Sequence, residues 1–224
     1  PRVLSVQKEK HRPGFGGLSI GPAWKRIAGT LGSIIFDAQT NEKLFLSNWH
    51  VIVLDNGTEL GSPILQPSKV DGARYPEDLF GRLERFAYLN SPEEGPNLVD
   101  AAVGKPTDPG DLYNDIYEVG FVNGMAEPQI GMEVALSSRD GVTRGKITDT
   151  GATFQVGGYP WGSSVFEDQF VMTPGIAKNG DSGGAIVDET TGSVVGLAFA
   201  GTYGLSLANR ASNVARILGV AWSP

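Results

Sequence analysis

One serine near the C-terminal end lies among glycines, in Asn179-Gly180-Asp181-Ser182-Gly183-Gly184. A serine hydroxyl is a weak nucleophile at neutral pH and needs a general base within hydrogen-bond reach. That base is most often a histidine whose ring is oriented by a carboxylate. The 224-residue chain has two histidines, so the base would be His11 or His50.

The two histidines lie in different surroundings. His11 belongs to the charged segment 8–13, which we expect to be a solvated arm with no packed neighbours to fix an imidazole. His50 lies between the apolar segments 44–46 and 51–54, where a buried strand would pass into a short turn. A histidine alone in an apolar setting is more often a satisfied core residue, but His50 is accompanied by other polar motifs. We therefore favour His50 as the base.

The third group should be a carboxylate removed from water, because a buried aspartate holds the imidazole tautomer and stabilises the imidazolium. Other acids, such as Asp108 and Asp111, stand beside Pro, Gly or Thr and look like solvated loop charges. Asp100 lies in Asn-Leu-Val-Asp-Ala-Ala-Val-Gly (97–104), where an unpaired carboxylate would be costly. The alternative is a strand-end aspartate capped by backbone amides.

Three segments resemble the signatures of trypsin/chymotrypsin-like serine peptidases. They are Gly180-Asp181-Ser182-Gly183-Gly184, Ser47-Asn48-Trp49-His50-Val51 and Asp100-Ala101-Ala102-Val103. Their order and rough spacing also match, and the chain is most similar to the cysteine-free, trypsin-like peptidases of bacteria. The resemblance extends from about residue 15 to the end of the chain.

This resemblance implies a serine endopeptidase with His50, Asp100 and Ser182 as its catalytic residues. Ser182 would form an acyl-enzyme, and the amides of Gly180 and Ser182 would make the oxyanion hole. Gly180 and Gly183 would let the backbone turn sharply around the serine. The chain offers no obvious N-terminal amine to pair with Asp181, so that residue's partner is left open.

The resemblance also indicates a substrate pocket. Ile176, six residues before the serine, would form its floor, and Phe199, Ala200 and Gly201 would form its wall. An apolar floor favours an apolar or small side chain before the cut. Phe199 stands where relatives often place a serine near the triad aspartate, so support for Asp100 is expected from elsewhere.

The composition indicates an all-β protein. Thirty-one glycines and fourteen prolines interrupt short runs rich in Val, Ile, Phe and Thr. Strands are expected at 30–37, 43–47, 79–86, 98–103, 132–137, 145–150, 152–156, 169–173, 184–187 and 193–199, and apolar residues at helical spacing predict a helix over 207–218. The resemblance implies two antiparallel β-barrels, chymotrypsin-like, with the site between them.

Clusters of turn-forming residues predict where the segments of the chain begin and end. We expect an N-terminal arm at 1–14, a first barrel at 15–105, a connector at 106–114, a second barrel at 115–206, and a C-terminal helix and tail at 207–224.

The charge and composition limit the partners. A net charge of −7 argues against a nucleic-acid surface. Without cysteine and with two histidines, neither a disulfide nor a metal site is expected, and no cofactor is implied. We expect a protein or peptide substrate, no membrane partner, and a chain that is cytoplasmic or exported in mature form. The sequence leaves the oligomeric state open.

A second class of function competes with the enzyme. A catalytically silent or latent protease-like fold could bind a peptide or protein partner, for example if the N-terminal segment closed the cleft. A complete triad favours the enzyme, because a binding module would not need all three residues. An esterase on another fold is disfavoured because its histidine would come last in the chain.

Overall fold

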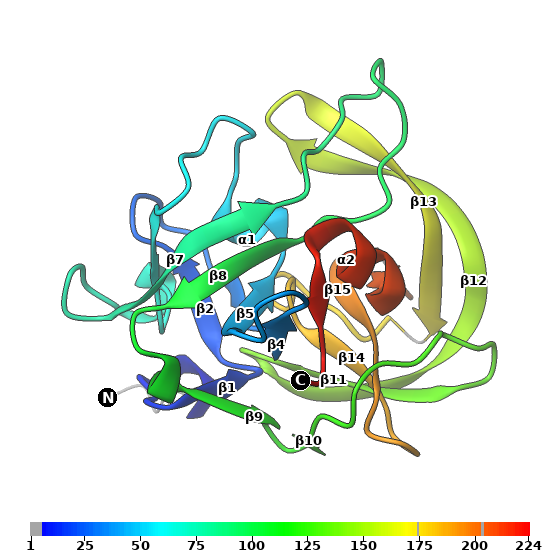
Figure 1. Cartoon of the computed structure of the whole chain (residues 1–224). Helices are drawn as coiled ribbons and strands as arrows, with labels where there is room; N and C mark the ends of the chain where they lie inside the picture. Colours follow the sequence, from blue (N-terminus) through cyan, green and yellow to red (C-terminus); the bar gives the residue numbers. More distant parts are fainter. Residues whose placement is uncertain (1–5, 174, 203) are drawn as a thin grey trace.

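The computed structural model describes residues 6–173, 175–202 and 204–224. Within them the chain is mostly β-strand, arranged in two large antiparallel sheets that lie against each other (Figure 1). This confirms the expected all-β fold with two barrel-like sheets and a C-terminal helix.

The first sheet is built from the N-terminal half and one C-terminal strand, in the order β17-β4-β5-β8-β7-β6-β2-β3. Its strands are β2 (Ser19–Pro22), β3 (Gly29–Thr30), β4 (Ser33–Asp37), β5 (Lys43–Ser47), β6 (Pro63–Leu65), β7 (Leu79–Phe86), β8 (Ala102–Pro106) and β17 (Val220–Ala221). The short helix α1 (Trp49–Ile52) follows β5, and the 3₁₀-helix η2 (Lys69–Asp71) follows β6.

The second sheet closes into a barrel in the order β11-β12-β13-β16-β15-β14. Its strands are β11 (Glu133–Ser138), β12 (Gly141–Tyr159), β13 (Gly162–Thr173), β14 (Ala185–Asp188), β15 (Val194–Thr202) and β16 (Leu205–Arg210). β12 and β13 form a long curved hairpin that sweeps around one side of the molecule (Figure 1).

A small sheet, β1-β9-β10, accompanies the two large ones. It contains β1 (Gly14–Gly16), β9 (Leu112–Ile116) and β10 (Gly120–Phe121), and the 3₁₀-helices η1 (Val6–Lys8) and η3 (Pro109–Asp111) lie near its ends. The expected connector, 106–114, thus contains the end of β8, η3 and the start of β9.

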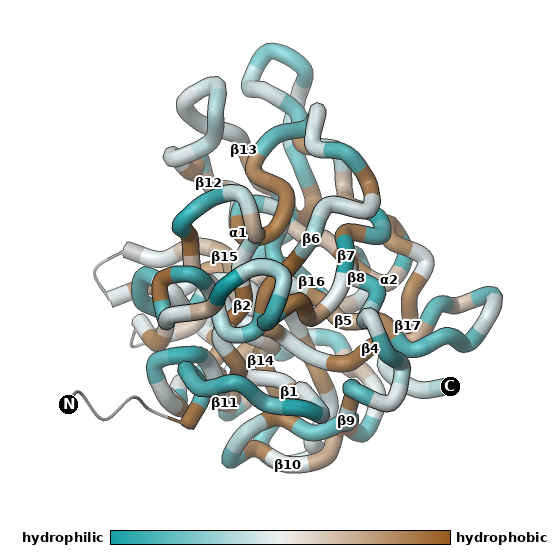
Figure 2. Tube along the Cα trace, turned by 90° about the vertical axis from the view of Figure 1, so that its left-hand side faces the viewer, coloured by the Kyte–Doolittle hydropathy of each residue, from teal (hydrophilic) through white to brown (hydrophobic). Residues whose placement is uncertain are grey.

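The two large sheets share their apolar cores. One buried cluster joins Ile34 and Phe45 of the first sheet to Phe166 of β13 and Phe199 of β15. Figure 2 shows the hydrophobic segments concentrated inside and the hydrophilic ones along the outer loops. Burying apolar surface from both sheets together fixes their mutual position, on which any site between them depends.

The helix expected over 207–218 is partly wrong. Residues 205–210 form β16, and the helix α2 spans Ala211–Leu218. Leu207 pairs with Val171 of β13, and Ala208 pairs with Ala198 of β15. Strand pairing on both sides therefore overrides the local helical spacing.

Two further differences concern lengths of strands and the N-terminal arm. The strands expected at 145–150 and 152–156 are parts of one strand, β12, and the strand expected at 98–103 begins at Ala102. The His11 ring packs 5.2 Å from the Phe15 ring, and its backbone N–H donates to Gln66 Oε1 at 2.8 Å. The described part of the arm therefore has packed neighbours, in β1 of the small sheet and directly after β6 of the first sheet.

Candidate active site

His50 is presented by a short helix that buries its other side chains. Trp49, Val51 and Ile52 of α1 are at most 1% exposed, whereas the His50 side chain is 28% exposed. The helix is anchored by Asn48, whose side-chain Nδ2 donates to the Asp100 backbone carbonyl at 2.6 Å. Burial of these three side chains thus fixes α1 and leaves the imidazole at the edge of a pocket.

Asp100 is fully buried and accepts hydrogen bonds from His50. Its Oδ2 lies 2.7 Å from His50 Nδ1, and its Oδ1 accepts the His50 backbone N–H at 3.1 Å. The Asp100 backbone N–H donates to Asn209 Oδ1 of β16 at 3.0 Å. The carboxylate therefore orients both the ring and the backbone of His50, and the second sheet holds the Asp100 backbone.

Tyr159 is a further partner of Asp100 that sequence reasoning missed. Tyr159 is the last residue of β12, and its hydroxyl donates to Asp100 Oδ2 at a distance of 2.5 Å. Burial, followed by the nearby Asp100 charge, raises the pKa of Tyr159 far above its ordinary range, so the phenol stays protonated and donates. No local signal marks this residue, because it reaches Asp100 only through the curvature of the β12–β13 hairpin.

Ser182 lies in a turn that we call the serine loop, residues 178–184, directly before β14. Its carbonyl accepts the Thr30 backbone N–H of β3 at 2.8 Å. A Cβ built on Gly183 would lie 3.3 Å from the Asn48 backbone N, two residues before His50. The serine is therefore brought from the second sheet to the segment that carries His50.

The two glycines around the serine adopt the expected backbone. Gly180 has φ +102° and Gly183 has φ +93°, a region in which L side chains are strained. No carbonyl or side chain among the described residues accepts a hydrogen bond from Gly180 N or Ser182 N. Both amides are thus free to bind an oxygen atom brought to the loop.

Asp181 has the partners that the sequence left open. Its Oδ1 accepts the Ser138 hydroxyl at 2.5 Å, and its Oδ2 accepts the Lys178 backbone N–H at 2.7 Å. Burial raises the pKa of Asp181 above its ordinary value. These two bonds hold the Asp181 carboxylate within the serine loop.

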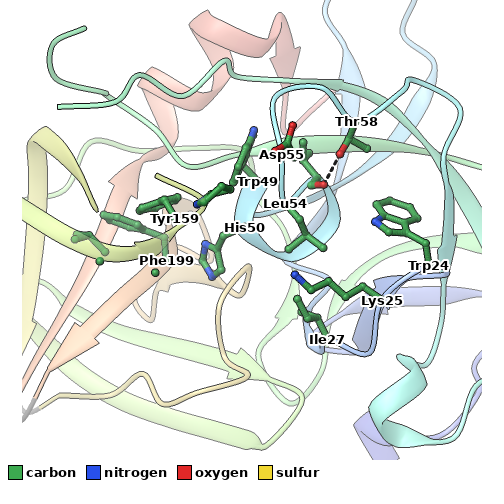
Figure 3. A pocket seen from close by; sticks show the side chains of 15 residues that line it. Trp24, Lys25, Ile27, Trp49, His50, Leu54, Asp55, Thr58, Tyr159 and Phe199 are labelled. Atoms are coloured by element: carbon green, nitrogen blue, oxygen red, sulfur yellow. Dashed lines mark hydrogen bonds between the residues drawn. The ribbon is translucent and has the colours of Figure 1, made fainter. Parts of the chain in front are cut away.

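A pocket of about 570 Å³ opens beside His50 (Figure 3). Its walls come from both sheets and include Trp24, Ile27 and Leu54 on one side and Tyr159 and Phe199 on the other. No described residue of the arm is among those that line it.

The residues expected to form the substrate pocket are divided between two places. Phe199 is 4% exposed and lines the pocket beside His50. Ala200 is partly buried and packs against the apolar cluster to which Phe199 belongs. Gly201 is exposed. Ile176 is 3% exposed and packs inside the closed barrel with Phe170 and Met172, so it does not line this pocket.

A family model for the trypsin-like peptidase domain matches residues 28–197. The chain belongs to the trypsin-like peptidases. The search of curated proteins found no match. Solved structures with the same fold include Nocardiopsis protease (TM-score 0.65, 18% identity, covering 92% of this chain and 96% of that chain) and Thermobifida fusca protease A (TM-score 0.63, 17% identity, 92% and 96%). A third is a glutamic acid-specific serine protease that uses a histidine triad in substrate binding (TM-score 0.64, 17% identity, 93% and 99%).

Within the described residues, no three His, Asp or Glu side chains gather in a way that could hold a metal ion. None of the helices in that part of the chain has the length and apolarity needed to cross a membrane.

Proposed function

We propose that this trypsin-like peptidase is a serine endopeptidase that cleaves peptide bonds through an acyl-enzyme on Ser182. The observation that carries the proposal is the hydrogen bond between His50 Nδ1 and Oδ2 of the fully buried Asp100, next to a loop that carries Ser182 and two free amides. A carboxylate that orients an imidazole, together with a serine, supplies the groups that acyl transfer requires.

The His50–Asp100 bond supports His50 as the general base. When Nδ1 carries the proton that Asp100 accepts, Nε2 has a free lone pair. Nε2 would accept the Ser182 proton as Oγ bonds to the scissile carbonyl carbon, and would then deliver that proton to the leaving amine as the C–N bond breaks. Water would attack the acyl-enzyme by the same route and restore Ser182.

The serine loop would stabilise the negative oxygen of the tetrahedral intermediate. Gly180 N and Ser182 N are the free amides. Two fixed N–H groups bind the oxygen more strongly when it carries negative charge in the transition state than when it is the neutral carbonyl oxygen of the substrate. Loss of one such donor typically costs ~10²- to 10³-fold in rate.

For the side chain before the cut, we propose a preference for apolar or small residues. The apolar residues Phe199 and Ala200, together with the exposed Gly201, support this preference. Ile176 does not support it, since its side chain packs in the barrel core. Cleavage of a peptide library tests the preference, and dominant cleavage after Arg or Lys would refute it.

A fluorophosphonate probe tests the proposed enzyme. We expect labelling of Ser182 in the wild type and none in Ser182→Ala, with His50→Ala strongly slowed. Hydrolysis of a casein substrate should follow the same order. A folded wild type that neither labels nor cleaves would contradict the endopeptidase and favour the binding module.

A further inference from the structure

An ion pair outside the proposed triad joins the two large sheets. Arg139, directly after β11, donates from Nη2 to Asp71 Oδ1 at 2.6 Å and from Nε to Asp71 Oδ2 at 3.0 Å. The two side chains are only 12% and 5% exposed. A bidentate pair of this kind fixes direction as well as distance.

Asp71 is held by the first sheet as well as by Arg139. The hydroxyls of Ser19 and Ser68 donate to its Oδ2 at 2.6 and 3.0 Å. Burial acts to raise the pKa of Asp71, but the hydrogen bonds from Arg139 and Ser19 outweigh it and lower the pKa. The carboxylate is therefore a fixed negative charge to which Arg139 is tied.

The backbone of Arg139 reaches the serine loop through one buried hydroxyl. Arg139 N–H donates to Thr30 Oγ1 at 3.1 Å, and the Thr30 hydroxyl donates to the Gly180 carbonyl at 3.0 Å. Thr30 is fully buried, and a hydroxyl has one proton to give. Because the Arg139 backbone N–H occupies a lone pair of Thr30 Oγ1, the hydroxyl proton is directed to the Gly180 carbonyl.

Thr30 holds the serine loop at two points. Its hydroxyl binds the Gly180 carbonyl, and its backbone N–H binds the Ser182 carbonyl at 2.8 Å. The peptide between Gly180 and Asp181 is also held at its other end, where Asp181 N–H donates to the Lys178 carbonyl at 3.0 Å. Each of the two residues whose amide is free, Gly180 and Ser182, therefore has its own carbonyl fixed by Thr30.

The Arg139 side chain also backs Gly180 directly. A Cβ built on Gly180 would lie 2.8 Å from Arg139 Nη1, and with φ +102° the residue is strained for any other side chain. Such a glycine can rotate its peptide planes easily unless its neighbours prevent it. The loop thus needs external contacts to hold its peptide planes in one orientation.

We propose that Arg139, fixed by Asp71, acts through Thr30 as a positioning residue that holds the amides of Gly180 and Ser182 in the geometry of an oxyanion hole. The inference rests on the proposed peptidase function, because it assigns a task to that same loop. None of the three side chains touches the reacting atoms in this arrangement.

Thr30→Val tests the hydroxyl, since valine keeps the shape and removes the hydrogen bond, and Thr30→Ser is the conservative rescue. We expect Thr30→Val to lower kcat for a p-nitroanilide peptide by ~10- to 100-fold, less than a deleted oxyanion donor, with KM within about twofold. Thr30→Ser should restore most of kcat. A Thr30→Val enzyme with wild-type kcat would overturn the proposal.

The ion pair is tested by Asp71→Asn, Arg139→Gln and the double variant. If the pair acts as a unit, each single variant should lower kcat and the double variant should be no worse than the poorer single one. The matched control is Arg85–Asp37, another pair at 2.8 Å within the first sheet, where Arg85→Gln should leave kcat unchanged. Equal losses of kcat in both pairs would overturn the specific role of Arg139.

A measurement independent of activity separates this proposal from the proposed function. In backbone NMR spectra, Thr30→Val should shift and broaden the amide signals of Gly180 and Ser182, and Thr30→Ser and Arg85→Gln should not. An inactive wild type with these shifts would contradict the peptidase but retain the positioning role. Unchanged amide signals in Thr30→Val would overturn the positioning role even in an active enzyme.

Discussion

At the residue scale, the chemistry depends on how a buried charge is satisfied. Asp100 has no exposed surface, and its two carboxylate oxygens accept from the His50 ring, the His50 backbone and the Tyr159 hydroxyl. Burial of an ionised carboxylate costs several kcal/mol unless such donors compensate it. The group that orients His50 therefore depends on a tyrosine from the other sheet.

Tyr159→Phe should weaken this arrangement. Loss of a hydrogen bond to a charged group is expected to lower the free energy of unfolding by about 1.5–3 kcal/mol and to slow fluorophosphonate labelling of Ser182. Urea denaturation and labelling kinetics measure the two effects. Tyr113→Phe, on a side chain 56% exposed, is the control. Equal behaviour of the two variants would show that the Tyr159 hydroxyl has no special role.

At the element scale, the site exists because strands and loops of the two sheets come very close. A Cβ built on Gly32, between β3 and β4, would lie 2.3 Å from the Gly183 carbonyl of the serine loop. A Cβ on Gly29 would meet Val51 of α1 at 2.5 Å and the Ser182 carbonyl at 2.9 Å. Glycine at these positions allows the serine loop to lie against the segment that carries His50.

Gly32→Ala should therefore separate the serine loop from the first sheet. The clash is with backbone, which cannot turn aside as a side chain would, so we expect the labelling of Ser182 to fall by tenfold or more and stability to fall by about 1–3 kcal/mol. Gly151→Ala, where a Cβ meets nothing within 4 Å, is the control. Wild-type labelling of Gly32→Ala would contradict the close approach.

At the scale of the whole molecule, the two sheets are expected to unfold together. They share buried clusters, and the C-terminal strand β17 returns from the second sheet to pair with β4 of the first. Trp222, 2% exposed, donates from Nε1 to the Ser33 hydroxyl at 2.9 Å. The segment around β17 thus connects the second sheet to β4 of the first sheet.

Trp222→Ala tests this coupling. Truncation of a buried tryptophan is expected to lower the free energy of unfolding by about 3–5 kcal/mol, in one transition that both far-ultraviolet circular dichroism and tryptophan fluorescence follow. Ile130→Ala, on a side chain 70% exposed, should change little. Two separate transitions in Trp222→Ala would indicate that the sheets unfold independently.

Acid stability should depend on Asp37 at the end of β4. Hydrogen bonds from the Thr40 and Gln39 backbone lower the pKa of Asp37 to about 2, below the ~3.9 of an unfolded chain. A lowered pKa means that the stabilisation is complete above about pH 4 and is lost as pH falls toward 2.

Asp37→Asn should therefore reduce the fall in stability between pH 4 and pH 2, as measured by urea denaturation at each pH. Glu133→Gln is the control, because that carboxylate is 67% exposed and lies 3.4 Å from its partner Lys146. An unchanged slope in Asp37→Asn would contradict the assignment.

The sequence by itself predicted the features that local patterns encode. Glycines around Ser182 indicated a sharp turn, and short apolar runs between turn formers placed β5 and β7 with the bounds that the structure has. His50 and Asp100 were singled out by their apolar surroundings, and the structure joins them by a hydrogen bond. Turn chemistry and strand periodicity act over a few residues, so they can be read from the chain directly.

Only the tertiary structure decided which distant residues meet. Tyr159 reaches Asp100 through the curvature of a hairpin, and Arg139 reaches Asp71 across the interface of the two sheets. Residues 207–210 have helical spacing but become strand because two neighbouring strands pair with them. These contacts depend on sheet register and on shared core packing, which are set by the whole chain and leave no mark in any short segment.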